Sequence, residues 1–197
     1  SLANTDEGLA RLQRLWSGDE QVTDLPLSEL EQISLASGLA IKGIVNAQEI
    51  LSQQSERLEN PDRLARFKFL RDSLSADLTV RAVFFESLKL ESNRDREAWV
   101  IAGLNNIHHP LRAQESIDLI APALNMIAEI QATGDIFFPG RWLDSTLSGH
   151  NSIEAAKTIR QFLDTALDLS PRLRLKVQQS ADSVFRAAYL VNGWRAD

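Results

Sequence analysis

Apolar residues recur every three or four positions along most of the chain, which is the spacing of an amphipathic helix. The clearest stripe comprises Leu64, Phe67, Leu70 and Leu74, and others include Leu9, Leu12 and Leu15–Trp16. Residues 80–85 (VRAVFF) are the best candidate for a strand, but they lie within a longer helical period. The pattern therefore predicts an all-α fold.

Helix start and stop signals separate these stripes. Ser28 with Glu31 three residues later forms a capping box, and Asn60 followed by Pro61 is a strong helix start. In the first half of the chain the signals predict helices from Asn4 or Thr5 to Gly18, from Ser28 with a break flanked by Gly38 and Gly43, over 44–58, from Asn60, and over 77–91. In the second half they predict helices from Asn93, over 111–133 with a kink or a break near Pro122, from Pro139 to Gly149, from Asn151 or Ser152 to about Leu167, and from Ser170 to about Val191.

About nine helices joined by short links are expected, and short links make neighbouring helices antiparallel. We predict one helical domain over residues 1–197, in which antiparallel helix pairs stack as an α-solenoid of the HEAT or armadillo kind. The sequence shows no clean repeat, and a compact helical bundle is the alternative.

The composition is that of an ordinary globular protein, with 44% hydrophobic and 24% charged residues. The net charge of −6 argues against a nucleic-acid partner. Cysteine is absent, which excludes disulfides and thiolate chemistry. No apolar run has the ~18 residues that a membrane span needs, and the location of the protein, cytoplasmic or periplasmic, stays open. Because the chain begins with Ser1, we expect a processed chain or an excised segment.

Catalytic and metal-binding motifs are missing from the sequence, so we predict no catalytic residue and no metal site in this chain. His108 and His109 are adjacent, so on a helix their side chains would point about 100° apart and would not bind one metal ion. Their place before Pro110 favours an interpretation as cations at a helix C-terminus. The zinc-peptidase pair HExxH is absent.

The segment GDIFFPGRWLDSTLSGHNS, residues 134–152, is the richest in unusual side chains. We interpret it as a packed corner between helices, with Phe137 and Phe138 in the core and Trp142, Leu143 and Leu147 on the buried side of the next helix. Arg141 and His150 flank it and are the only chemically versatile side chains there. Farther on, Arg172, Arg174 and Lys176 give the densest positive charge; solvated cations are one interpretation, and a site for peptide carboxylates is the other.

GDIFFPGRWLDSTLSGHNSIEAA (134–156) and SPRLRLKVQQSAD (170–182) resemble the C-terminal helical region of zinc aminopeptidases of the aminopeptidase N family. The resemblance is greatest to bacterial members whose C-terminal half is similar to that of endoplasmic-reticulum aminopeptidases. HHPLR (108–112) and TDEGLARLQRLWSG (5–18) fit the same resemblance, which covers nearly the whole chain.

The resemblance implies that this chain is the C-terminal part of a larger metallopeptidase that removes N-terminal residues from peptides. An upstream catalytic domain would bind zinc through HExxH and a later Glu, and would hold the substrate amine through a GxMEN-type motif. No cofactor is expected in the present chain, whose partners would be that catalytic domain and peptide substrates. It would cap the active-site chamber, with Arg141 and His150 at the chamber or interface and Arg172 and Arg174 as peptide contacts.

A freestanding helical-repeat adaptor that binds a protein or peptide in its groove is the alternative function. It depends on architecture alone, and a fold does not determine a function.

Overall fold

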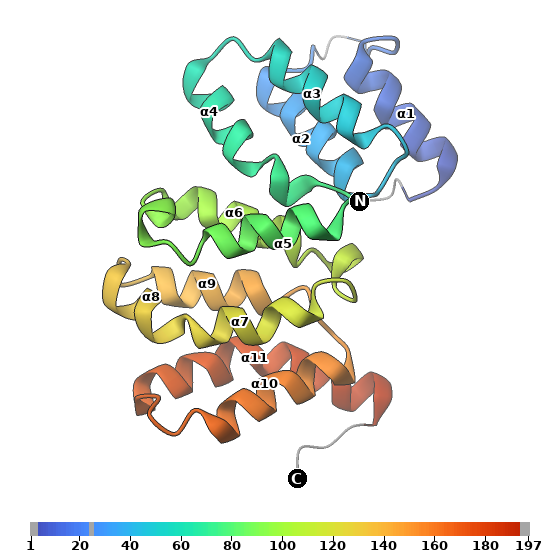
Figure 1. Ribbon diagram of the computed structural model, residues 1–197. Coiled ribbons are helices and arrows are strands. Elements are labelled where there is room, and N and C mark those ends of the chain that lie inside the picture. Colours follow the sequence, from blue (N-terminus) through green and yellow to red (C-terminus); the bar gives the residue numbers. More distant parts are fainter. Residues whose placement is uncertain (1–3, 24–25, 194–197) are drawn as a thin grey trace. The chain divides into compact units, whose positions relative to one another are not determined.

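The computed structural model describes residues 4–23 and 26–193, and they form helices connected by turns (Figure 1). Eleven α-helices and four short 3-10 helices lie in this part of the chain, and no strand does. The predicted all-α class is therefore confirmed, and residues 80–85 lie within a helix. The chain divides into two compact units, residues 1–81 and 82–197. The single domain over 1–197 stays a prediction, and each unit is described by itself.

Unit 1 has four full helices and the beginning of a fifth, and three of the full helices begin at predicted caps. Thr5 caps the first helix, which ends at Gly18 with φ 93°, and Asn60 caps the fourth through two backbone N–H groups. Gly38 lies inside a helix, so the predicted break occurs only at Gly43, with φ 70°. The elements are α1 (Asp6–Ser17), α2 (Glu29–Ile41), α3 (Ala47–Arg57), α4 (Pro61–Leu70), η1 (Asp72–Leu74) and α5 (Leu78–Ser87), which crosses the division.

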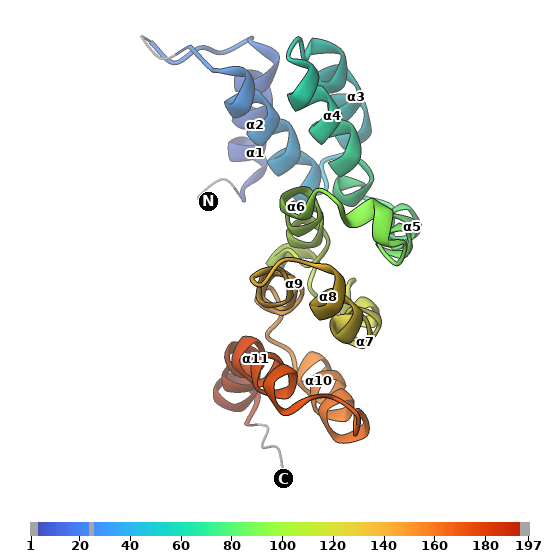
Figure 2. The ribbon, with the colours of Figure 1, turned by 90° about the vertical axis from the view of Figure 1, so that its left-hand side faces the viewer.

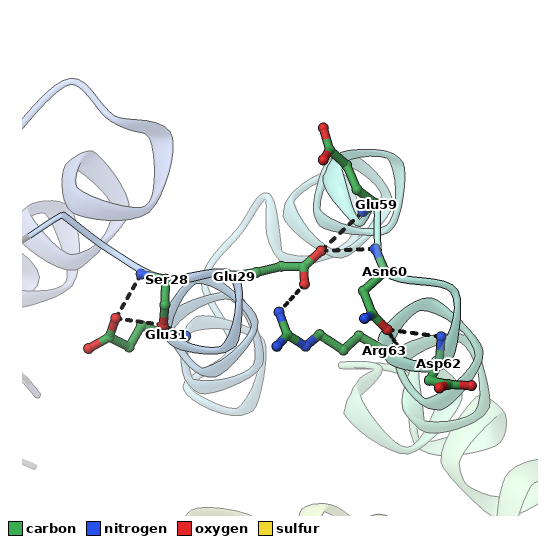
Figure 3. A network of polar contacts seen from close by, with 7 residues as sticks. All are labelled: Ser28, Glu29, Glu31, Glu59, Asn60, Asp62 and Arg63. Atoms are coloured by element: carbon green, nitrogen blue, oxygen red, sulfur yellow. Dashed lines mark hydrogen bonds and ion pairs between the residues drawn. The ribbon is translucent and has the colours of Figure 1, made fainter.

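A polar network fixes the starts of α2 and α4 (Figure 3). The Glu29 carboxylate forms an ion pair with Arg63 and accepts the backbone N–H of Glu59 at 3.0 Å. The pKa of Glu29 lies below its usual value, mainly because the Arg63 side chain donates a hydrogen bond to the carboxylate. The backbone N–H of Asn60 lowers this pKa further. Because Glu29 is the first residue of α2, its contacts tie that helix to the turn before α4.

The capping box at the start of α2 is present in full: Ser28 Oγ accepts the Glu31 N–H at 3.3 Å, and Glu31 Oε2 accepts the Ser28 N–H at 2.7 Å (Figure 3). We expect Ser28→Ala to lower the free energy of unfolding by about 1 kcal/mol, because it leaves the N–H of Glu31 without its acceptor. Ser55→Ala, inside α3, is the matched control and is expected to be neutral or slightly stabilising. Urea unfolding of both variants measures the difference, and equal effects would contradict the assignment.

The core of unit 1 consists of two clusters of apolar side chains. One gathers Trp16, Ala36, Leu39 and Ile50 from α1, α2 and α3. The other joins α2, α3, α4 and η1 through Ala40, Ala47, Leu51, Leu58, Phe67 and Leu74. The predicted stripe of Leu64, Phe67, Leu70 and Leu74 thus contributes to this core, with Leu64 partly buried.

Unit 2 differs from the prediction in its middle. The segment 111–133 is not one long helix: it is broken into 3-10 turns and two short helices. Pro122 lies in the first turn of the first of these helices, where its missing N–H costs no hydrogen bond. Asn93 is no helix cap either, because it lies inside a 3-10 turn. The elements are η2 (Glu91–Arg94), α6 (Glu97–Ile107), η3 (Pro110–Arg112), η4 (Ile117–Leu119), α7 (Ile120–Asn125), α8 (Ile127–Thr133), α9 (Phe138–Leu147), α10 (Ile153–Thr165) and α11 (Pro171–Asn192).

The helices of unit 2 lie in two layers (Figure 2). In one layer α9 contacts α6 on one side and α11 on the other, and in the second layer α7 contacts α10. Contacts of α9 with α7 and α8, and of α10 with α11, join the layers. Helix α9 is therefore the centre of unit 2, and the segment that the sequence singles out, residues 134–152, contains it.

Candidate functional site

The turn before α9 is held by two carboxylates and one guanidinium. Glu97 Oε1 accepts the backbone N–H of Asp135 at 2.8 Å, and Arg141 Nη2 lies 2.9 Å from Asp135 Oδ2 and 3.3 Å from Glu97 Oε2. Desolvation raises the pKa of Glu97. Desolvation acts the same way on Asp135, but hydrogen bonds from the backbone N–H groups of Phe137 and Phe138, among other contacts, bring the pKa of Asp135 below its usual value. Arg141 thus clamps the turn.

The two phenylalanines of this turn point to different surroundings. Phe138 is 1% exposed and Phe137 is 71% exposed. The prediction that both lie in the core is therefore wrong for Phe137. Asp135 Oδ1 accepts N–H bonds from both residues, at 2.6 Å and 2.7 Å, and these bonds fix a backbone turn in which only the second ring faces inward.

Trp142 occupies the centre of the corner, as predicted, and is fully buried. Its ring meets Phe138 edge-on with centroids 6.0 Å apart, and its Nε1–H donates to the carbonyl of Ala123 at 3.0 Å. The indole thereby joins α9 to α7 with its polar atom paired, which is how a buried Trp is accommodated. Leu143 and Leu147 are buried beside it, which confirms the packed corner on this side.

His150 forms a buried pair with His108 from the end of α6. His150 Nε2 lies 2.9 Å from His108 Nδ1, and the two residues are 4% and 2% exposed. Desolvation is the main cause that lowers the pKa of His108 to about 3, and the nearby His150 ring is the second cause. Desolvation also lowers the pKa of His150, to about 4. The interpretation of His108 as a cation at a helix end is therefore wrong, because the ring is neutral at pH 7. No group of three or more potential ligand side chains that could hold a metal ion lies among the described residues.

The two predicted arginines of α11 differ in their surroundings. Arg174 donates to the carbonyls of Leu163 and Ala166, so it caps the C-terminal end of α10, where a cation is favourable. Arg172 is exposed, and its guanidinium makes no hydrogen bond or ion pair with any described residue. The structure thus brings none of Arg141, His150, Arg172 and Arg174 into a common site; their predicted roles at a chamber wall or interface stay predictions.

Arg94 is a buried cation that the sequence pattern does not indicate. It is 4% exposed, donates to the carbonyls of Leu88 at 2.6 Å and Lys89 at 3.1 Å, and forms an ion pair with Glu129. No local signal separates it from its exposed neighbours. His108 did carry a signal, since Val100, Leu104 and His108 follow one helical face at intervals of four residues.

Cavities lie in both units. In unit 1 a cavity of about 590 Å³ is lined by Trp16, Gln32 and Arg57 among others, with the Arg57 guanidinium 4.3 Å from the centre of the Trp16 ring. In unit 2 a groove of about 360 Å³ lies between α9 and α11 and is lined by Ile136, Phe137, Gly140, Asp144, Lys176, Gln179 and Ser180. The groove of unit 2 belongs to the same corner as the exposed ring of Phe137.

Comparisons of the chain with protein-family models, with curated proteins and with solved structures give no match. None of the helices in the described part of the chain is long and apolar enough to cross a membrane.

Proposed function

We propose that the chain is the noncatalytic helical domain of a zinc aminopeptidase of the aminopeptidase N family, C-terminal to a catalytic domain that removes N-terminal residues from peptides. The observation that supports the proposal is the place in the fold of residues 134–156 and 170–182, the two segments that resemble the aminopeptidase N family. They form α9, which lies at the centre of unit 2, together with the beginning of α10 and the first half of α11. Their distinctive side chains serve to hold helices together, through Trp142 on α7 and Arg174 on α10.

The two-layered packing of unit 2 supports the finer architecture that we propose, an α-solenoid of the HEAT or armadillo kind. In such a stack the pair α8–α9 and the pair α10–α11 are successive repeats, with α6 preceding them. Each pair buries its apolar faces on its neighbours, so the stack supplies a rigid wall. The wall limits which peptides reach the upstream zinc site and excludes bulk water from it.

Arg172 is the predicted peptide contact that is best supported, because its guanidinium is exposed and has no described partner. A planar guanidinium with free N–H groups can hold a carboxylate through two hydrogen bonds. Arg174 is already engaged by carbonyls of its own unit. We therefore assign any recognition of acidic peptide groups in this region to Arg172 first.

The upstream coding sequence tests the proposal most directly. We expect it to encode HExxH and a later Glu, and we expect the full-length protein to bind zinc and hydrolyse aminoacyl nitroanilides. The 197-residue chain alone should do neither. A natural reading frame that starts close to Ser1, or turnover by the 197-residue chain, would overturn the proposal; such a reading frame together with a stoichiometric partner in a pull-down would replace it with the helical adaptor.

A further inference from the structure

The exposed side chains of Ile136 and Phe137 are held in place by buried structure. They are 66% and 71% exposed, yet the turn that carries them is fixed by Asp135, Glu97 and the burial of Phe138. Covering a Phe side chain contributes about 1.5–3 kcal/mol. The backbone that carries the exposed ring is therefore fixed before a partner binds, so little backbone entropy is lost when the ring is covered.

The groove between α9 and α11 lies directly beside this ring, and Phe137 forms part of its edge. Its volume of about 360 Å³ is large enough for an aromatic side chain. Gly140 helps to keep it open, since no heavy atom lies within 4 Å of where a Cβ would stand. A protruding ring and a recess that fits one thus occur on the same patch.

The groove also carries one charge of each sign, and neither is neutralised by an opposite charge among the described residues. Asp144 Oδ1 accepts the hydroxyl of Ser180 at 2.6 Å, and Lys176 Nζ donates to the Gln131 amide oxygen at 2.8 Å. Both partners are uncharged. A two-fold axis brings the same patch of two copies together, so the ring of one can face the recess of the other and the anion of one can face the cation of the other.

We propose that this surface binds a second copy of the chain as an isologous dimer. The Phe137 ring of each copy enters the groove of the other, and Lys176 of each copy lies opposite Asp144 of the other. We infer a second copy as the partner because each copy supplies one aromatic ring, one anion and one cation, which are the groups that the same surface of the other copy can receive. One ring and one pair of charges from each copy make a small contact, so we expect a weak dimer, with a dissociation constant in the micromolar range or above. The dimer is independent of the proposed function.

Sedimentation velocity of the 197-residue chain over about 1 to 500 µM tests the dimer. We expect the mass to rise with concentration from 22.0 kDa toward twice that value. Phe137→Ser should abolish the rise. Leu190→Ser is the matched control, because Leu190 is 76% exposed in the same unit but lies outside the groove, and it should leave the rise unchanged.

Charge exchange tests the pairing itself. Asp144→Lys and Lys176→Asp should each abolish the dimer, because like charges then meet twice across the axis. The double variant should restore it. Circular dichroism confirms that each variant is folded. A wild-type chain that is monomeric throughout, a Phe137→Ser variant that still dimerises, or a folded double variant that fails to recover would overturn the proposal, and binding of a different partner to a strictly monomeric chain would do the same.

Discussion

Gly149→Ala is expected to destabilise unit 2 by about 3 kcal/mol or more, which is the largest effect of any single methyl group that we expect in this chain. A Cβ at Gly149 would lie 1.8 Å from the carbonyl oxygen of His108. That contact is with backbone, so no side-chain rotation relieves it. The end of α6 or the turn after α9 has to move, and both are packed against buried side chains.

Gly140→Ala is the matched control for this prediction. Gly140 lies in α9 with open space where a Cβ would stand, so the substitution is expected to stabilise the helix by about 0.5–1 kcal/mol. Hydrogen exchange read by mass spectrometry, on peptides that cover α6 and α9, assigns each change to unit 2. Effects of equal sign at the two glycines would contradict the close approach of Gly149 to His108.

Helix ends were predictable where a local side chain satisfies the free N–H groups of the first turn. Thr5, Ser28, Asn60, Ser152 and Ser170 all cap helices as the sequence indicates. The break between α7 and α8 was not predictable, because neither Gly nor Pro marks it. It lies at Met126, where the N–H bonds to the carbonyl of Leu124 and tightens the end of α7.

The corner around α9 was predictable only where hydrophobicity alone determines whether a side chain lies in the core or in solvent. Trp142 and Phe138 are buried as expected, but the hydrogen bonds of Asp135 determine where Phe137 points, and no hydrophobic pattern contains them. The contact of His108 with His150 spans 42 residues. It depends on how α6 packs on α9, and Gly149, which the sequence marks as a helix stop, is there because His108 comes so close.

The buried histidine pair is arranged so that a proton fits poorly. His108 Nε2 is buried without a hydrogen-bond partner. A buried lone pair without a donor costs less than a buried N–H without an acceptor, so we assign the proton to His108 Nδ1, which donates to His150 Nε2. Protonation of His108 would place both a charge and an unpaired N–H in the core. The pair therefore favours the neutral state in the folded protein.

Acid is consequently expected to destabilise unit 2 between about pH 6.5 and pH 4. The folded-state pKa values of about 3 and about 4 lie below the ordinary value of 6.5, so the unfolded chain binds more protons in this window and stability falls as the pH falls. Between pH 7.5 and pH 5 the expected loss is about 2 kcal/mol for each ring and about 4 kcal/mol for the pair. Carboxylates with lowered pKa values, such as Glu29, also reduce the stability of the folded chain when they are protonated, but only at lower pH. Glu97 has a raised pKa, so its protonation increases the stability of the folded chain as the pH falls.

Urea unfolding at a series of pH values measures the slope, which reports the protons taken up on unfolding. The wild-type chain should take up nearly two protons near pH 5.5 through this pair, and His150→Gln or His108→Gln should take up about one. Ser55→Ala, which removes no titrating group, is the control and should keep the full slope. Equal slopes in the His150→Gln, His108→Gln and wild-type chains would show that the buried pair does not govern acid stability, since removal of either ring has to remove one titrating group from the core.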